Sequence, residues 1–167
     1  MKKIFFSFLC LLIVTASFSQ TDSIPDYKKF PYFPTVRFMM PDSVSYFTKS
    51  NLEKNKPVMV MVFSPLCEHC QHETEELIKN IDKFKDIQIV MTTSMPFDTM
   101  LHFIEKYKLS QYKNIIVTHD ANFTLPVFYR LHNLPFLAFY DKKKNLISVF
   151  EGGMPMNAIL EVFKDKD

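Results

Sequence analysis

The pattern of apolar and polar positions predicts alternating strands and helices over most of the chain. Residues 58–63 are six apolar residues in a row, a run too short for a membrane span and typical of a strand buried on both faces. After residue 70, apolar residues recur at helical spacing, with acidic side chains early and lysines late. That charge order suits the helix dipole. We therefore expect a buried strand followed by a helix whose first turn includes residues 67–70.

Similar patterns predict the remaining elements. In the helix expected at 43–51, Asp42 or Ser43 would be the cap, and Val44 and Phe47 would form the buried side. Alternation of strands and helices favours a parallel sheet with covered faces, to which a tight turn at 141–145 adds an antiparallel edge. The fold class is thus α/β, with a mixed central sheet flanked by helices on both faces. The other strands are expected at 35–40, 87–92, 115–117, 134–140 and 146–150, and the other helices at 97–107, 124–131 and 156–163.

The start of the chain has the features of a secretory signal peptide. Two lysines precede an apolar core at 4–14, and residues 17–19 form a small-x-small cleavage site. Cys10 lies inside the apolar core, but bulky residues precede it, which disfavours lipid attachment. We therefore expect an exported, periplasmic protein, or one tethered to a membrane by an uncleaved N-terminal segment. The predicted division is a signal peptide at 1–20, an extended, loosely packed tail at 21–34 and one domain at 35–167.

Composition narrows the choice of function. The chain has 20 basic and 18 acidic residues, and the predicted signal peptide holds two of the lysines and no acid, so the remainder is balanced. A neutral domain has no electrostatic footprint for nucleic acid. Most of the ten methionines lie in apolar runs, where core packing is their usual role. We accordingly expect no cofactor and no resident metal.

Cys67 and Cys70 carry the candidate chemistry. A helix start favours the thiolate, which is the reactive form of cysteine, and a protonated His69 would add a positive charge beside the pair. Cys67 would be the exposed, attacking thiol, and Cys70 would be close enough to close a disulfide with it. Because so short a disulfide constrains the unfolded chain little, redox chemistry is favoured over a structural bridge. A metal site formed by the two cysteines and a histidine is the alternative.

Taken together, these features resemble the thioredoxin fold. They are a strand, a Cys-x-x-Cys at the start of the next helix, and a later proline that leads into a strand, a hairpin and a last helix. The resemblance is closer to the TlpA/ResA-like branch of exported thiol-disulfide oxidoreductases and covers residues 35–163. Residues 67–73 look like that branch's CxxCxxE pattern, and residues 97–120 resemble its extra helix and strand. Two departures are Leu66, where tryptophan is usual, and Met61, where thioredoxins carry a buried acid.

The resemblance also implies roles for individual residues. Glu73 would move the proton that Cys70 must lose, and Pro135 would be the family's cis proline. A cis peptide there would direct the Leu134 backbone toward the cysteines, so that an extended substrate segment could pair as a strand. Phe136 would either line the substrate groove or pack in the core.

The implied partners are protein thiols and disulfides, with a membrane electron donor as a further candidate, and we expect a monomer. The alternative function is a non-enzymatic module of the same fold that binds a metal or a partner protein.

Overall fold

The computed structural model describes residues 24–164, so the predicted signal peptide, its Cys10 and residues 165–167 lie outside the described residues. The helices are α2 (Asp26–Lys29), α3 (Glu68–Lys79), α4 (Phe97–Lys106), α5 (Thr124–Tyr129) and α6 (Met156–Lys164). Short 3-10 turns are η2 (Lys49–Asn51), η3 (Ile81–Phe84) and η4 (Leu109–Gln111). The strands are β1 (Arg37–Met39), β2 (Tyr46–Thr48), β3 (Val58–Val62), β4 (Gln88–Thr93), β5 (Ile115–His119), β6 (Phe136–Tyr140) and β7 (Leu146–Glu151).

These strands form one mixed sheet, in the order β2-β1-β5-β4-β3-β6-β7. Strands β3, β4 and β5 are parallel, whereas β6 pairs antiparallel with both β3 and β7. Val62 at the end of β3 pairs with Phe136, and Val58 at its start pairs with Tyr140. The segment after β3 and the segment before β6 therefore meet at the same end of the sheet. The predicted mixed sheet and its antiparallel hairpin are confirmed.

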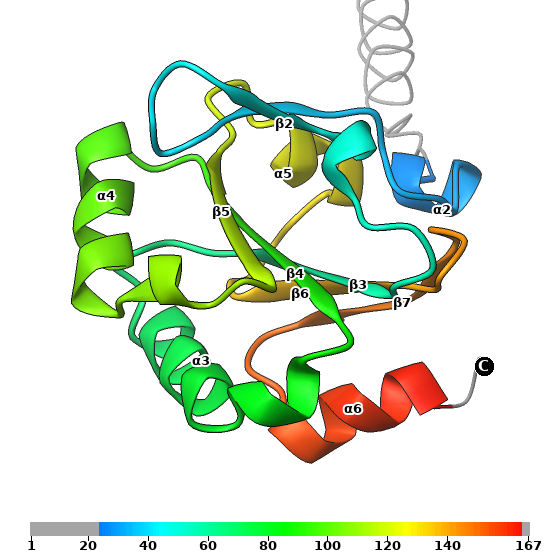
Figure 1. Ribbon diagram of the computed structural model, residues 1–167. Coiled ribbons are helices and arrows are strands. Elements are labelled where there is room, and N and C mark those ends of the chain that lie inside the picture. The colour runs from blue at the N-terminus through cyan, green and yellow to red at the C-terminus, as the bar shows by residue number, and fades with distance from the viewer. Residues whose placement is uncertain (1–23, 165–167) are drawn as a thin grey trace, which may run out of the picture.

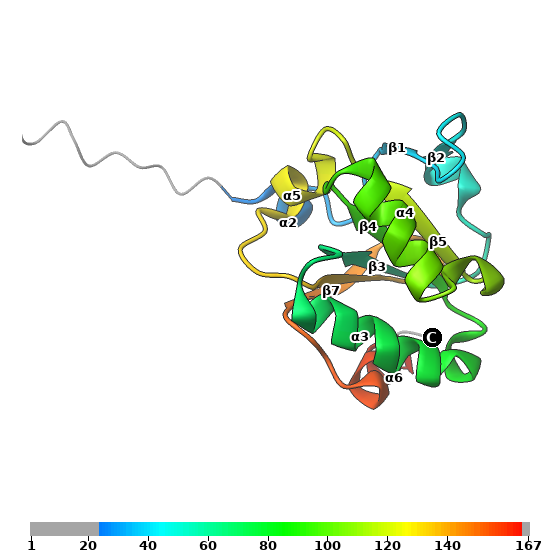
Figure 2. The same ribbon diagram turned by 90° about the vertical axis from the view of Figure 1, so that its left-hand side faces the viewer.

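Strand β3 is buried on both faces, as its apolar run predicts. Met59 and Met61 belong to a core shared with α3, α4 and α6, whereas Val60 and Val62 belong to a second core shared with α5. Figure 1 shows α3 and α6 below the sheet and α2 and α5 above it. The turned view places α4 over β4 and β5 (Figure 2). The helices thus cover both faces of the sheet.

The helix expected at 43–51 is wrong. The segment forms the turn and second strand of a hairpin, in which Phe47 pairs with Phe38 and is buried while Val44 is 78% exposed. The Asp42 carboxylate accepts hydrogen bonds from the backbone N–H groups of Val44 and Ser45, so it closes a turn rather than capping a helix. As a result β1 is not the edge of the sheet, because β2 lies outside it.

The expectation of a loosely packed tail is also wrong for residues 26–34. Residues 26–29 form α2, and the Phe33 side chain is buried against Tyr140, with ring centroids 5.2 Å apart. The Phe33 N–H donates to the Lys144 carbonyl, and Tyr32 forms a bridge with Asn145. This segment is therefore part of the second core.

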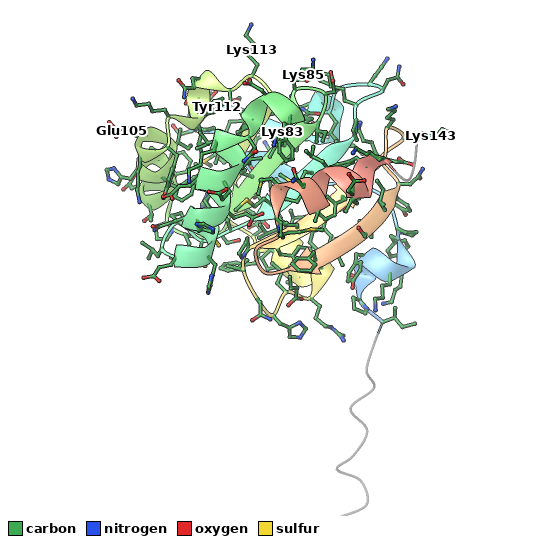
Figure 3. The ribbon with its side chains drawn as sticks, turned by 90° about the horizontal axis from the view of Figure 1, so that it is seen from below. Lys83, Lys85, Glu105, Tyr112, Lys113 and Lys143 are labelled. Atoms are coloured by element: carbon green, nitrogen blue, oxygen red, sulfur yellow. The ribbon has the colours of Figure 1, made fainter. Side chains whose placement is uncertain are left out.

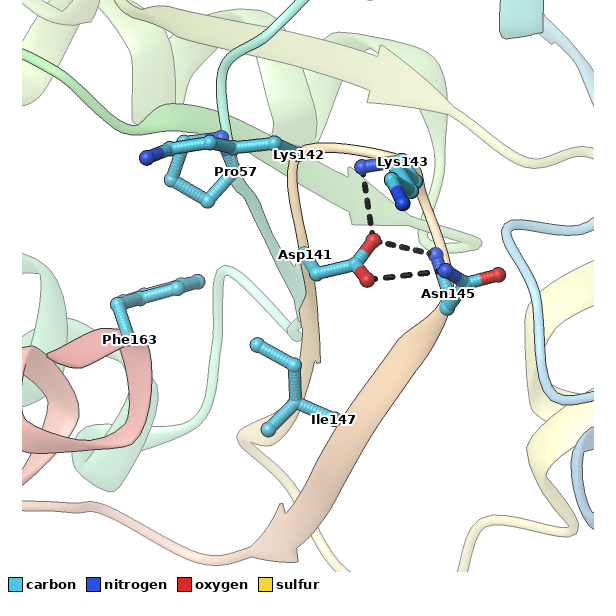
Figure 4. A pocket seen from close by; sticks show the side chains of 7 residues that line it. All are labelled: Pro57, Asp141, Lys142, Lys143, Asn145, Ile147 and Phe163. Carbon is cyan, nitrogen blue, oxygen red and sulfur yellow. Dashed lines mark hydrogen bonds between the residues drawn. The ribbon is translucent and has the colours of Figure 1, made fainter. Parts of the chain in front are cut away.

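The turn between β6 and β7 lies at the opposite end of β3 from the cysteines. Its Asp141 carboxylate accepts from the N–H groups of Lys143 and Asn145 and from the Asn145 side-chain amide (Figure 4). The Lys144 ammonium is buried and donates to the carbonyls of Glu53, Lys56 and Lys142. These contacts join the turn to the loop that precedes β3. The pocket beside the turn therefore lies at the end of the sheet away from the cysteines.

Candidate active site

Cys67 and Cys70 lie where β3 gives way to α3. Cys67 occupies the N-cap position, its N–H donates to the Ser64 carbonyl at 3.1 Å, and its carbonyl accepts the first helical bond, from Gln71. Cys67 is partly exposed, whereas Cys70 is fully buried one turn further along, and both are free thiols. The expected exposed and buried pair at a helix start is thus present.

Burial makes the second thiol difficult to ionise. The pKa of Cys70 is raised to about 12, chiefly by burial; a backbone hydrogen bond from Ser64 lowers it in part, while the neighbouring Cys67 thiol and the Glu73 carboxyl add to the rise. Cys70 is therefore a thiol at neutral pH. Any attack by this sulfur requires a group that takes its proton.

The Leu134–Pro135 loop meets the cysteines across the sheet. The peptide bond between these two residues is cis, as the resemblance implies. The Cys67 thiol donates to the Leu134 carbonyl, with 3.8 Å between the sulfur and oxygen atoms. Residues 67 positions apart in sequence are thereby brought into contact, and the backbone of Leu134 faces the thiol that is open to a partner.

Phe136 does not line this site. Its side chain is 1% exposed and packs in the second core on the ring of Tyr129, with centroids 4.7 Å apart. The physical reason is its position as the first residue of β6, opposite Val62, where its side chain points to the buried face. Of the two alternatives expected for Phe136, its side chain therefore packs in the core and does not line the substrate groove.

Glu73 lies one turn beyond Cys70, and its side chain is only 5% exposed. Its Oε2 accepts a hydrogen bond of 3.0 Å from the Met154 N–H, while its buried Oε1 has no hydrogen-bonding partner among the described residues. Burial raises the pKa of Glu73 to about 7, although the Met154 bond and the charge of His72 lower it in part. This carboxyl can thus exchange a proton near neutral pH.

Beside Glu73 a pocket of about 610 Å³ lies between α3 and α6. His69 and His72 are exposed on α3 and both line it. Sequence reasoning placed His69 beside the cysteines but missed His72 and Met154 as neighbours of Glu73. His72 directly precedes Glu73, so the sequence could have indicated that contact. The sequence around Glu73 gives no sign of Met154.

A second, largely apolar pocket of about 300 Å³ adjoins the Leu134 loop. Leu66, which immediately precedes Cys67, is also apolar and is 68% exposed. Sequence reasoning did not identify this pocket, because its walls come from four separate segments. They are Val62, Phe63, Ser64, Ser94, Met95, Phe123, Pro126, Leu131, His132, Asn133 and Leu134.

Within residues 24–164, no three or more histidine, cysteine, aspartate or glutamate side chains gather in a way that could hold a metal ion. The two cysteines and a histidine therefore do not form a ready ligand set in this part of the chain. Over the same residues, no helix has the length and apolar character needed to cross a membrane.

The sequence profile of the thioredoxin-like domain family matches residues 47–166, which is more than half of the chain. The chain belongs to this family. The matched region of the thioredoxin-like domain begins in β2 and contains both cysteines, Glu73 and the Leu134–Pro135 loop. No curated protein matches the chain in sequence.

Solved structures share the fold of this thioredoxin-like domain at low sequence identity. A secreted disulfide oxidoreductase of Mycobacterium tuberculosis, homologous to Escherichia coli DsbE, is 17% identical with a TM-score of 0.64, covering 77% of this chain and 93% of its own. The exposed lipoprotein thioredoxin of Streptococcus pneumoniae is 24% identical with a TM-score of 0.60, covering 79% and 99%. A thiol-disulfide oxidoreductase of Bacteroides fragilis is 12% identical with a TM-score of 0.64, covering 78% and 97%.

Proposed function

We propose that this thioredoxin-like domain is an exported thiol-disulfide oxidoreductase of the TlpA/ResA-like branch, which exchanges a Cys67–Cys70 disulfide with partner proteins. The observation that carries the proposal is a partly exposed Cys67 at the start of α3, with a buried Cys70 beneath it and the Leu134 carbonyl beside it. The structural neighbours, which include a secreted disulfide oxidoreductase and an exposed lipoprotein thioredoxin, support this chemistry and export.

In the reducing direction, Cys67 acts first. Its thiolate attacks one sulfur of a partner disulfide, which forms a mixed disulfide and releases the other partner sulfur as a thiolate. Cys70 then attacks the Cys67 sulfur. The mixed disulfide breaks, the partner leaves as a dithiol and a Cys67–Cys70 disulfide remains, so two electrons pass from the protein to the partner. The reverse sequence oxidises a partner dithiol.

The second attack depends on Glu73. Because burial keeps Cys70 protonated, its proton must leave as the new sulfur–sulfur bond forms. The Glu73 carboxyl has a pKa of about 7, so it is partly ionised at neutral pH and can accept this proton. It then passes the proton to solvent through the pocket between α3 and α6.

Leu134 and the cis Pro135 bind the partner's backbone in this proposal. The Leu134 carbonyl contacts the Cys67 sulfur, so a partner cysteine joined to Cys67 has its main chain next to this loop. An extended partner segment can pair there as a short strand. His69, exposed on the first turn of α3, supports the Cys67 thiolate when protonated.

Turnover with dithiothreitol tests the proposal. The wild-type protein should accelerate reduction of insulin disulfides, and Cys67→Ser should lower the rate to that of dithiothreitol alone. Cys70→Ser should also lose turnover but hold a partner covalently through Cys67, in an adduct that excess reductant releases. The double variant, Cys67→Ser with Cys70→Ser, is the control for non-specific adducts. No acceleration by the wild type, together with no adduct on Cys70→Ser, would show that the domain is not an oxidoreductase.

A further inference from the structure

The segment between β7 and α6 approaches Glu73 more closely than a hydrogen bond alone requires. A Cβ atom added at Gly153 would lie 3.0 Å from Glu73 Oε2, which is tighter than ordinary van der Waals contact. The same oxygen accepts the Met154 N–H at 3.0 Å. The Met154 N–H thus holds this carboxyl oxygen, and a side chain at Gly153 would press against it.

The backbone conformation at residue 153 does not require glycine. Gly152 has a φ of 102°, in the left-handed region that favours glycine, whereas Gly153 does not lie in that region. An alanine at 153 would therefore meet only the carboxyl group. The two glycines therefore have different roles. Gly152 allows the backbone to turn, and Gly153 leaves space for the Glu73 carboxyl.

Building on the proposed function, we infer that Gly153 is a positioning residue for proton transfer. It allows the Met154 N–H to hold Glu73 Oε2 and thereby leaves the buried Oε1 free to take the Cys70 proton. Cys70 and Glu73 are both buried and lie three residues apart on α3, so their side chains are neighbours on one side of the helix. The pocket that receives the proton is lined by both Gly153 and Met154. Seen from below, both α3 and α6 lie on the near face of the sheet (Figure 3).

Few charged groups near Glu73 could shift its pKa in the way proposed for Gly153. The α6 side of the pocket contributes Met154, Met156 and Asn157, none of which titrates. The titratable or charged groups around Glu73 are all on or just after α3, namely His69, Cys70, His72, Glu76 and Lys83. A change at Gly153 leaves every one of them in place.

The test follows the two attacks separately with Ellman's reagent. Cys67 of the reduced protein attacks the reagent and releases a first thionitrobenzoate. Cys70 then attacks the Cys67 mixed disulfide and releases a second, as its proton passes to Glu73. The pH dependence of the second release in the wild type should have a midpoint near that of Glu73. Two releases in the wild type also test the proposed function, independently of Gly153.

Gly153→Ala should displace Oε2 from the Met154 N–H, a bond that stabilises the carboxylate. The midpoint of the second release should rise by about one pH unit, which slows this release about fivefold at pH 7. The first release should keep its rate and thereby show that the helix start is intact. Asn157→Ala is the control, because this exposed, uncharged side chain lines the same pocket from α6, and the midpoint should stay where it is.

The effect of Gly153→Ala should depend on the Glu73 carboxyl. In a Glu73→Gln background the second release should be slow and lack this midpoint, and adding Gly153→Ala should change nothing further. If Gly153→Ala leaves the midpoint unchanged or lowers it, or acts equally in the Glu73→Gln background, the positioning role is wrong. In that case two releases by the wild type would still leave the oxidoreductase proposal standing.

Discussion

Glu73 is a carboxyl group held where a negative charge is poorly solvated, and its ionisation is therefore coupled to folding. Burial raises its pKa from an ordinary 4.5 to about 7. Between pH 4.5 and 7 the Glu73 carboxyl is therefore protonated in more of the folded molecules than of the unfolded ones. Stability from this group is full below pH 4.5 and is lost as the pH rises through 7.

We expect the reduced wild-type protein to lose about 3 kcal/mol relative to Glu73→Gln as the pH rises from 4 to 8. Urea unfolding at several pH values measures this difference, and comparison with the variant cancels the contributions of the histidines. Parallel stability profiles for the two proteins would mean that Glu73 ionises as freely in the folded state as in the unfolded chain.

The candidate reacting residues were easier to predict from sequence than their surroundings. Cys67, Cys70 and Pro135 were predictable because their chemistry follows from a local motif and a recognisable position in the fold. The burial of Glu73 was not, since Met154 contacts it from 81 positions away. Phe136 was left open for a related reason: one strand residue does not reveal which face of the sheet receives it.

At the scale of elements, long periodic segments were predictable and short ones were not. The order from β3 to α6 agrees with the apolar pattern, because α3, α4 and α6 are long enough to show a helical period and β3 is a continuous apolar run. Strand β2 has three residues, and the spacing of Val44 and Phe47 fits a helix as well as a turn followed by a strand. Pairing of Phe47 with Phe38 decides between them, and this is a tertiary contact.

Helix α5 depends on a buried aspartate that precedes it. Asp120 is 1% exposed, and its carboxylate accepts from the backbone N–H groups of Thr124 and Leu125 at 2.9 and 2.8 Å. Asp120→Ala should therefore lower the free energy of unfolding by about 3 kcal/mol, because one buried and one partly buried N–H donor lose their acceptor. Chemical denaturation followed by circular dichroism measures the loss.

Asp42 provides the matched control for this prediction. It accepts from the N–H groups of Val44 and Ser45 at 2.9 and 2.8 Å, but it is exposed, so water replaces the lost acceptor. Asp42→Ala should cost about 1 kcal/mol or less. Equal losses for the two variants would indicate that burial of Asp120 adds nothing to the stability of α5.

For the whole molecule, the sheet explains why the two cysteines and the Leu134–Pro135 loop come together. The loop that carries Cys67 leaves the end of β3, and β6 enters next to it in the opposite direction. The turn at residues 141–145 and the buried Lys144 lie at the other end of the same strands. One end of the sheet thus carries the candidate chemistry, and the other holds the hairpin against the loop before β3.

The packing of the segment before β1 was not predicted from the sequence either, and Phe33 tests its importance. Phe33 is fully buried on Tyr140 in the second core, whereas Phe30, three positions earlier, is about half exposed. Phe33→Ala should therefore lower the free energy of unfolding by about 3–5 kcal/mol through the cavity it leaves. Phe30→Ala should change it by less than about 0.5 kcal/mol. Urea unfolding measures both variants, and similar small losses would mean that residues 26–34 are an appendage to the thioredoxin-like domain rather than part of its core.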